Sequence, residues 1–527
     1  MSEFPFQRSG RSPALGERGM VATSHPLASL TALDVLRSGG NAVDAAVAAA
    51  AVLAVVEPAM TGVGGDLFAL VAPKGGAPVA INASGCAPAA ADPDALLAQG
   101  HDLIPKASAH AVTVPTGVAG WEALTEAYGS RGLGELLQPA IRTARDGFRV
   151  TPRVAFDWAH YAEALAAQPA TAALYLKDGA APRLGERHAF PQLANTLEAI
   201  AKGGAKAFYQ GEIAAKLVAR LRELGGVHAA DDFAAAEAEW VAPIATDYRG
   251  LTVYECPPNG QGVVALLMLN MLEGDDVPVA SADWHHLLAE VTRLAYRERD
   301  LVVADPRIAG KAEIDLLDRA YARRLRGHIA MDRAMGALPD RLLPPHKDTV
   351  YLTVVDEHGT AVSFINSIYD SFGSTLVCPD TGVLFHNRGR AFRLVEGHPN
   401  RLAPHKRPMH TIIPALAYKG GQPWLSFGVM GGDYQCTGQV QLLKAVVQDG
   451  LDPQAALELP RTFAYPHTLQ VEATLPAAVV AALERRGHAI EPTASPLGGG
   501  QAILIDRDAG LLVGGTDPRK DGLALGY

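Results

Sequence analysis

Thr349 stands at the entrance to an apolar, β-branched run at 350–356 and directly follows a polar, proline-rich approach at 343–347. A threonine in this setting suits a peptide bond that cleaves itself, because cleavage would make the threonine a new N-terminus. Its hydroxyl and free amine would then form a nucleophile and a base within one residue. Taken alone, the segment predicts only a buried strand entered from a loop. Asp348 and Thr349 therefore form a candidate cleavage site that depends on its surroundings.

A glycine pair, Gly431-Gly432, is the second candidate, because it lies between a predicted strand at 424–428 and a predicted helix at 436–449. Two glycines there can aim consecutive backbone N–H groups at one point, as an oxyanion hole requires. The alternative, still open from spacing alone, is an ordinary tight turn. Ser367, just after the next predicted strand, adds a further hydroxyl.

Several other motifs do not carry the chemistry that they suggest. His286 and Glu290 lie one helical turn apart, but no second pair and no HExxH motif accompanies them, which favours a helix-surface role over a metal site. The glycines at 62–65 and 498–500 lack the remainder of a phosphate-binding fingerprint, which predicts turns. The sequence contains no GxSxG elbow and no SxxK pair, which argues against those serine hydrolases. We therefore expect no metal and no cofactor.

Composition limits the class of protein. The chain has 527 residues, of which 48% are hydrophobic and 19% charged, as in a globular protein with a large core. The formal net charge of −10, with both signs mixed along the chain, predicts no nucleic-acid-binding face. The four scattered cysteines fit a reducing compartment. The first twenty residues lack the apolar core of a signal peptide, and the longest apolar run, 45–56, is too short for a membrane span. These features predict a cytoplasmic protein with no membrane partner.

The predicted secondary structure that must position the candidate residues is mainly helical in the first part of the chain and mainly strand in the last third. Asn41 is the expected N-cap of a helix at 42–56 that is apolar on all sides and should be buried. Further helices are predicted at 118–128, 134–147, 191–203, 212–224, 282–299 and 475–487. Further strands are predicted at 20–24, 67–71, 360–366, 382–385, 412–418, 501–506 and 510–514. Helices first and strands later predict helices packed on stacked sheets.

Short motifs placed in order along the chain resemble the γ-glutamyltransferase family of N-terminal-nucleophile hydrolases. They are GGNAVDAA at 39–46, EP at 57–58, GVGG at 62–65, VPTGVAGW at 114–121, YRG at 248–250, PPNGQG at 257–262, the 349–356 run, RPMHT at 407–411 and the glycine pair at 431–432. Each motif is weak by itself, but their order from residue 39 to residue 432 is specific.

The resemblance implies an α+β fold, a four-layer αββα sandwich made as a proenzyme and cut before Thr349. The two products, residues 1–348 and 349–527, would form one fold as a heterodimer and could pair further into a dimer. Thr349 is then the nucleophile, the glycine pair binds the oxyanion, and Ser367 aligns with the threonine that supports the nucleophile's hydroxyl. An α-amino group titrates near about 7.7–8.0, so the released amine can act as the base.

The residues that would read a glutamate head group depart from the family pattern. The Arg-Glu-x-Ala-Pro run that binds the substrate α-carboxylate corresponds to SGCAP at 84–88, and Ala391 stands where an acid binds the α-amine. Tyr369 replaces an asparagine, and His410-Thr411 replace a serine pair. A charge left unpaired in a closed pocket costs several kcal/mol, so glutathione-like compounds should bind poorly.

Arg388 and Arg390 bring positive charge instead. We expect one of them to grip an acyl-side carboxylate bidentately, as in oxamate or a glutaryl amide; a purely structural arginine is the equally open alternative. Asp433 joins Tyr369 and the pair at 410–411 as an expected substrate contact. The NRGRAF run at 387–392 and GGDYQ at 431–435 resemble the family's acylase and oxamate-amidohydrolase-like branch.

The predicted function is therefore a self-processing amidohydrolase or acyltransferase acting on a small-molecule amide. Two alternatives stay open: a true γ-glutamyl hydrolase or transpeptidase, and a catalytically silent homologue that binds a small ligand. Thr353 is the nearest rival nucleophile, but it lies inside the apolar strand.

Overall fold

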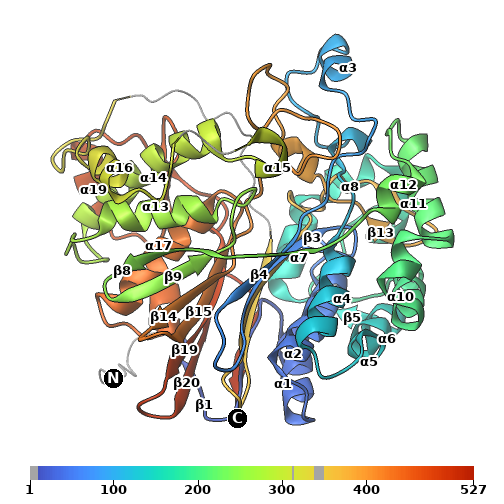
Figure 1. Cartoon of the computed structure of the whole chain (residues 1–527), viewed down its shortest axis with the longest axis horizontal. Helices are drawn as coiled ribbons and strands as arrows, with labels where there is room; N and C mark the ends of the chain where they lie inside the picture. Colours follow the sequence, from blue (N-terminus) through green and yellow to red (C-terminus); the bar gives the residue numbers. More distant parts are fainter. Residues whose placement is uncertain (1–9, 311–313, 337–348) are drawn as a thin grey trace.

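Two seven-stranded antiparallel sheets lie face to face, with helices on the outer face of each (Figure 1). This computed structural model describes residues 10–310, 314–336 and 349–527. The hydrophobic core is layered in the same way: one core lies under each helical layer and a third lies between the sheets. The predicted αββα sandwich is confirmed.

Each sheet takes strands from both ends of the chain. The first sheet has the order β1 (Ala14–Gly16), β20 (Leu511–Thr516), β19 (Gly499–Asp506), β15 (Gln422–Met430), β14 (Ala415–Lys419), β9 (Leu251–Glu255), β8 (Ile244–Tyr248). The second has the order β21 (Ala524–Gly526), β2 (Met20–Ala22), β10 (Val350–Val355), β11 (Ala361–Ser367), β3 (Asp66–Ala72), β4 (Val79–Ala83), β7 (Glu239–Val241).

The helices divide between the two outer layers. The second sheet is covered by α1 (Pro26–Arg37), α2 (Ala42–Val56), α4 (Gly117–Tyr128), α5 (Leu133–Leu136), α6 (Gln138–Asp146), α10 (Pro191–Tyr209) and α11 (Glu212–Glu223). The first sheet is covered by α13 (Gly262–Leu272), α14 (Ala282–Val302), α16 (Arg319–Arg326) and α17 (Tyr434–Val447).

Shorter elements fill the periphery. The helices among them are α3 (Pro93–Ala98), η1 (Ala109–Ala111), α7 (Pro152–His160), α8 (Ala162–Ala166), α9 (Pro169–Tyr175), α12 (Ala230–Ala234), α15 (Pro306–Ala309), η2 (Arg388–Ala391), α18 (Pro453–Leu457) and α19 (Ala477–Arg485). The strands among them are β5 (Phe148–Arg149), β6 (Arg187–His188), β12 (Val377–Cys378), β13 (Val383–Leu384), β16 (Thr462–Ala464), β17 (Leu469–Val471) and β18 (Ile490–Pro492).

Helix α2 begins and ends where the sequence predicts. The Asn41 side chain accepts from the Asp44 N–H while the Asp44 carboxylate accepts from the Asn41 N–H, which makes a capping box. All fifteen residues of the helix are buried, because it is enclosed between the second sheet and other helices.

Three predictions need correction. Helix 191–203 continues to Tyr209 across a kink at Gly204, where φ is 67°. Gly499 and Gly500 belong to strand β19 rather than to a turn. His286 and Glu290 do not lie on a helix surface: both are buried, because α14 packs between the core of its layer and the segment before residue 337.

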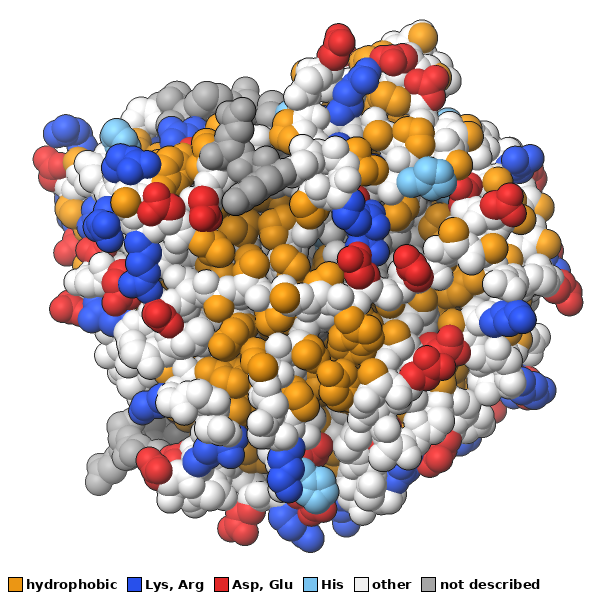
Figure 2. Space-filling model, viewed as in Figure 1, with side chains coloured by type: hydrophobic (Ala, Val, Ile, Leu, Met, Phe, Trp, Pro, Cys, Tyr) orange, Lys and Arg blue, Asp and Glu red, His pale blue; other side chains and the backbone are white. Residues whose placement is uncertain are grey.

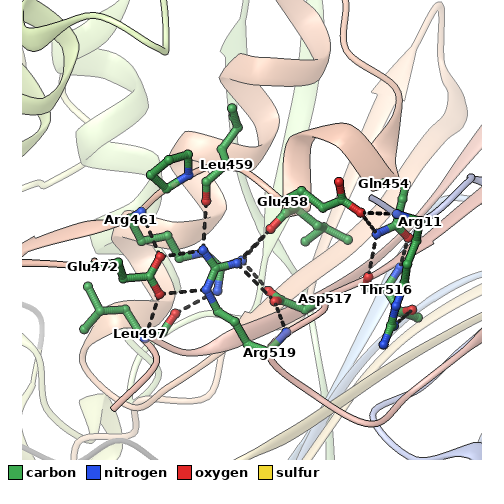
Figure 3. A network of polar contacts seen from close by, with 12 residues as sticks. Arg11, Gln454, Glu458, Leu459, Arg461, Glu472, Leu497, Thr516, Asp517 and Arg519 are labelled. Carbon is green, nitrogen blue, oxygen red and sulfur yellow. Dashed lines mark hydrogen bonds and ion pairs between the residues drawn. The ribbon is translucent and has the colours of Figure 1, made fainter. Parts of the chain in front are cut away.

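A polar network joins the N-terminal segment to the C-terminal strands (Figure 3). Arg519 donates through Nε to Glu472 at 2.7 Å and through Nη1 to Asp517 at 3.1 Å. The backbone N–H of Arg11 donates to Glu458 at 2.8 Å. The segment before β1 is thereby fixed to α18 and β20, at one edge of the first sheet.

The surface in Figure 2 carries hydrophobic side chains across its middle, with acidic and basic side chains interspersed mainly around them. None of the described helices is both long enough and apolar enough to cross a membrane.

Candidate active site

Thr349 points into the space between the two sheets. In the adjoining strand β10, Val350 and Leu352 pack in the core under the helices, whereas Tyr351 packs between the sheets. Because side chains alternate along a strand, Thr349 shares the direction of Tyr351. The nucleophile candidate is fully buried.

Contacts between the sheets place Thr349 near the end of β15. Thr353 Oγ1 lies 2.6 Å from Ser426 Oγ. Two residues earlier on β10 and two residues later on β15, the Tyr351 ring faces Gly428. The contact is so close that a Cβ on Gly428 would lie 2.3 Å from a ring atom. The next step of two residues brings Thr349 to the level at which β15 ends and the glycine pair begins.

Ser367 ends β11 beside the nucleophile candidate. Thr349 Oγ1 lies 3.1 Å from Ser367 Oγ, which also accepts from the Tyr369 N–H at 3.0 Å. Tyr369 has a φ of 77°, a region that aromatic residues rarely adopt. The Arg388 guanidinium covers its ring at 4.6 Å. These contacts hold the loop after β11 against the candidate nucleophile.

The glycine pair forms the turn between β15 and α17 with positive φ angles, 120° at Gly431 and 57° at Gly432. Neither N–H donates a hydrogen bond to any residue in the described part of the chain. Both residues are buried. Two adjacent buried N–H groups that are not used by the described residues could serve as the donors of an oxyanion hole.

Arg299, buried in α14, holds this turn from behind. Its Nη1 donates to Asp433 Oδ1 at 2.6 Å and to Gln261 Oε1 at 2.9 Å. Gln261 in turn donates to the Gly432 carbonyl at 3.3 Å and to the Thr411 carbonyl at 2.8 Å. The Asp433 side chain is therefore already engaged by protein; its predicted contact with substrate stays a prediction.

Asp66, at the start of β3, is the electrostatic centre beside the site. Arg388 binds it bidentately, with Nε to Oδ2 at 2.8 Å and Nη2 to Oδ1 at 3.1 Å, and His410 Nε2 lies 2.8 Å from Oδ2. Burial alone would raise the pKa of Asp66, but Arg388 and His410 outweigh it and hold that pKa well below its usual range. Burial, together with Arg388, lowers the pKa of His410 to about 4, so the imidazole is neutral at pH 7.

The two predicted arginines therefore have protein partners. Arg388 Nη1 donates to Thr411 Oγ1 at 3.1 Å in addition to its bonds with Asp66. Arg390 pairs with Asp370, whose carboxylate also accepts from Asn387 at 2.7 Å. The structure thus brings the predicted residues together around Thr349, while substrate contacts of Arg388, Arg390, His410 and Thr411 stay predictions. Asp348 and the approach at 343–347 lie outside the described residues.

Among the described residues, one cluster of possible metal ligands exists, made of His286, Glu290 and His488. His286 Nδ1 is hydrogen-bonded to His488 Nε2 at 2.8 Å, and its Nε2 donates to the Ala330 carbonyl at 2.8 Å. Arg293 lies 3.3 Å from the Glu290 carboxylate and opposes a cation there. The cluster is well explained as a hydrogen-bonded link between α14, the segment at 330–336 and the segment after α19.

A profile described as gamma-glutamyltranspeptidase matches residues 28–527. The chain belongs to the gamma-glutamyltranspeptidase family. The prediction that it is an enzyme of this group of hydrolases and transferases is confirmed at that level.

Relatives within the gamma-glutamyltranspeptidase family match almost end to end. The "Glutathione hydrolase-like YwrD proenzyme" of Bacillus subtilis is 38% identical, covering 97% of this chain and 99% of its own. The "Oxamate amidohydrolase proenzyme" of Klebsiella pneumoniae is 36% identical, covering 98% of this chain and 100% of its own. The solved structure of cephalosporin acylase from Bacillus halodurans superposes with a TM-score of 0.93 at 39% identity, covering 100% of this chain and 99% of its own.

Sequence reasoning missed several residues that shape this family member's site, chiefly Asp66, Gln261 and Arg299. Asp66 directly follows the predicted turn at 62–65, and a lone acid at the entrance of the apolar run 67–71 is a signal that could have found it. Gln261 and Arg299 give no local signal, because their partners lie far away in the sequence.

Proposed function

We propose that this chain is a self-processing amidohydrolase or acyltransferase whose nucleophile is Thr349. The observation that carries the proposal is the placement of Thr349 Oγ1 between the sheets, 3.1 Å from Ser367 Oγ and level with the donors of Gly431 and Gly432. In this setting the hydroxyl can attack a carbonyl whose developing oxyanion meets two backbone N–H groups. The proenzyme names of the two relatives support self-processing.

The proposed self-cleavage is an N-to-O acyl shift. Thr349 Oγ bonds to the carbonyl carbon of residue 348 and loses its proton, the C–N bond breaks, and the nitrogen becomes the free amine of Thr349. Water then hydrolyses the ester, which releases residues 1–348 as one chain and residues 349–527 as the other. The two chains stay together as a heterodimer, since both sheets contain strands from each.

The same residue then acts on an external amide. The free amine of Thr349 takes the hydroxyl proton, Oγ bonds to the amide carbon, and the leaving amine carries that proton away as the C–N bond breaks. Water or an acceptor amine resolves the resulting ester. Ser367 orients the hydroxyl, and the glycine pair binds the oxyanion in both half-reactions.

An acidic acyl group other than γ-glutamyl suits this site best. Ser84 and Ala391 supply neither the cation nor the anion that a glutamate head group needs. The relatives named as an oxamate amidohydrolase and a cephalosporin acylase favour the same reading. The second candidate, hydrolysis of glutathione-like compounds, is favoured by a relative named "Glutathione hydrolase proenzyme" from Escherichia coli, 32% identical over 98% of this chain.

Replacement of the nucleophile tests the proposal. Wild-type protein should run as two unequal bands on a denaturing gel, with the smaller chain starting at Thr349 by mass spectrometry, whereas Thr349→Ala should stay as one chain. Thr353→Ala is the matched control: its hydroxyl bonds Ser426 inside the strand, and the variant should still be cut. A Thr349→Ala protein that splits at the same bond would refute the assignment. Purified enzyme assayed on oxamate, glutaryl and γ-glutamyl amides would rank the acyl groups.

A further inference from the structure

Arg393 is a buried arginine with two guanidinium nitrogens that lack a hydrogen-bond partner in the described part of the chain. Its residue surface is 5% exposed, and neither Nε nor Nη1 has a partner among the described residues. A buried, unpaired charge costs several kcal/mol, so natural proteins seldom keep one without a use. The neighbouring arginines differ, because Arg388 binds Asp66 and Arg390 binds Asp370.

The backbone turns this side chain away from the nearest apolar core. Phe392 and Leu394 both pack into a small core with Ala87 and Leu402. The segment between them is extended and pairs with a second segment, since the N–H of Leu402 donates to the Arg393 carbonyl at 2.9 Å. By alternation, Arg393 projects from the opposite side.

That opposite side leads to the candidate active site. His398, in the same loop, bonds the Asp300 carbonyl at 3.0 Å, which fixes the loop to the end of α14. Burial lowers the pKa of Arg393, while Asp300 and Tyr369 oppose that shift and Arg299 adds to it. Tyr369 is the residue whose N–H bonds the hydroxyl of Ser367. Arg393 follows η2 by two residues, and η2 carries Arg388 over the Tyr369 ring. Arg393 therefore lies in the loop that joins the Tyr369 side of the candidate site to the end of α14.

No carboxylate in the described part of the chain forms an ion pair with the Arg393 guanidinium. The Asp300 carboxylate accepts from Arg299 Nε at 2.8 Å, and Arg299 Nη1 also donates to Asp433. These two acids thus already share one guanidinium. A ligand carboxylate would supply Arg393 with the bidentate partner that arginine binds well.

We propose that Arg393 is the specificity residue that binds the free carboxylate of an acidic acyl group while Thr349 attacks its amide. This inference rests on the proposed function. It assigns the carboxylate to an arginine with unused donors and leaves Arg388 as the structural partner of Asp66.

Paired substrates provide the test. Glutaryl-p-nitroanilide and its neutral counterpart, valeryl-p-nitroanilide, are assayed with wild-type protein and with Arg393→Gln. The variant should lose about 10- to 100-fold in kcat/KM on the acidic amide, mainly through KM, and change less than about 3-fold on the neutral one. Arg393→Lys should recover part of the loss, since it restores the charge without the fork. An equal loss on both substrates would overturn the proposal.

Thermal unfolding gives a readout that needs no turnover. Arg393→Met should melt at least about 2 °C higher than wild type without ligand, because the unpaired charge is gone. Free glutarate should raise the Tm of wild type but not of that variant. A lower Tm for Arg393→Met, with the glutarate effect retained, would identify a structural arginine instead.

Arg401, the residue that pairs with Arg393 in a β-bridge, provides a matched control. Arg401 pairs with Asp94 near the surface, so Arg401→Gln should leave both the substrate ratio and the glutarate effect unchanged. If wild type releases amine from neither substrate, the proposed function fails, whereas the glutarate measurement still decides the role of Arg393.

Discussion

At the residue scale, the Ser367 hydroxyl joins the candidate nucleophile to the loop that follows. It accepts from the Tyr369 N–H at 3.0 Å and lies 3.1 Å from Thr349 Oγ1. Tyr369 is held at a φ of 77° by this bond and by the guanidinium over its ring. A single oxygen therefore contacts both the candidate nucleophile and the backbone of the loop after β11.

Replacement of Ser367 should separate these roles. Ser367→Ala removes the hydroxyl and should slow both the appearance of the small chain and kcat by about 10- to 100-fold. Ser367→Thr keeps the oxygen and should stay within a few-fold of wild type. Timed denaturing gels and steady-state rates on one amide measure the two effects. Identical rates for Ser367→Ala and wild type would remove Ser367 from the mechanism.

At the element scale, the turn between β15 and α17 depends on α14. Arg299 is completely buried and pairs with both Asp300 and Asp433, and Gln261 carries the connection on to the Gly432 carbonyl. Removal of a buried cation leaves its partners as uncompensated charges, a loss of about 3–5 kcal/mol. The turn that carries the proposed oxyanion donors is thus held in place by this ion pair and by Gln261.

Arg299→Lys should expose that dependence in the kinetics. Lysine keeps the charge but cannot bridge Asp433 and Gln261 together, so kcat should fall by about 10-fold or more while KM changes little. Arg297→Gln, two residues earlier and half-exposed, is the control and should change neither constant. A fall in stability with kcat unchanged would show that the ion pair supports the fold and not the turn.

Helix α2 ends at Glu57, a buried acid whose ionisation depends on pH. Two residues later, the Ala59 carbonyl accepts from the Phe372 N–H. Burial raises the pKa of Glu57 to about 7, although Lys520 and a hydrogen bond from Ser24 oppose the rise. Since the unfolded value is about 4.5, the protonated folded form is stabilised below that pH, and this stability is lost as pH rises through 7.

Glu57→Gln should therefore change how stability depends on pH. The variant lacks the titration, so it should equal wild type near pH 5 and exceed it by a few kcal/mol near pH 8, on the order of 1.4 kcal/mol per pKa unit. Urea unfolding at both pH values measures the difference. A constant offset between the two proteins would mean that Glu57 does not titrate in this range.

At the scale of the whole molecule, the sequence predicts what local patterns encode. Helix α2, strand β10 and the glycine turn follow from capping, a β-branched apolar run and turn chemistry, and the layered architecture follows from the resemblance. Helix α13 was missed because it is buried and apolar all round, which leaves no period to detect. The Asp66 centre was missed because Arg388 and His410 lie more than 300 residues away in the chain.

The proposed cleavage would make the lifetime of the folded molecule depend on its strand order. Strands β10 and β11, after Thr349, lie between β2 and β3, which come from the first 72 residues. In the other sheet, β14, β15, β19 and β20 lie between β1 and β9. A cleaved molecule that unfolds would have to reassemble from two separate polypeptides, with a loss of chain connectivity at every interleaved strand. Its working lifetime would then be set by the rate of unfolding rather than by an equilibrium. The precursor folds as one chain, whereas a cleaved molecule that unfolds would be lost.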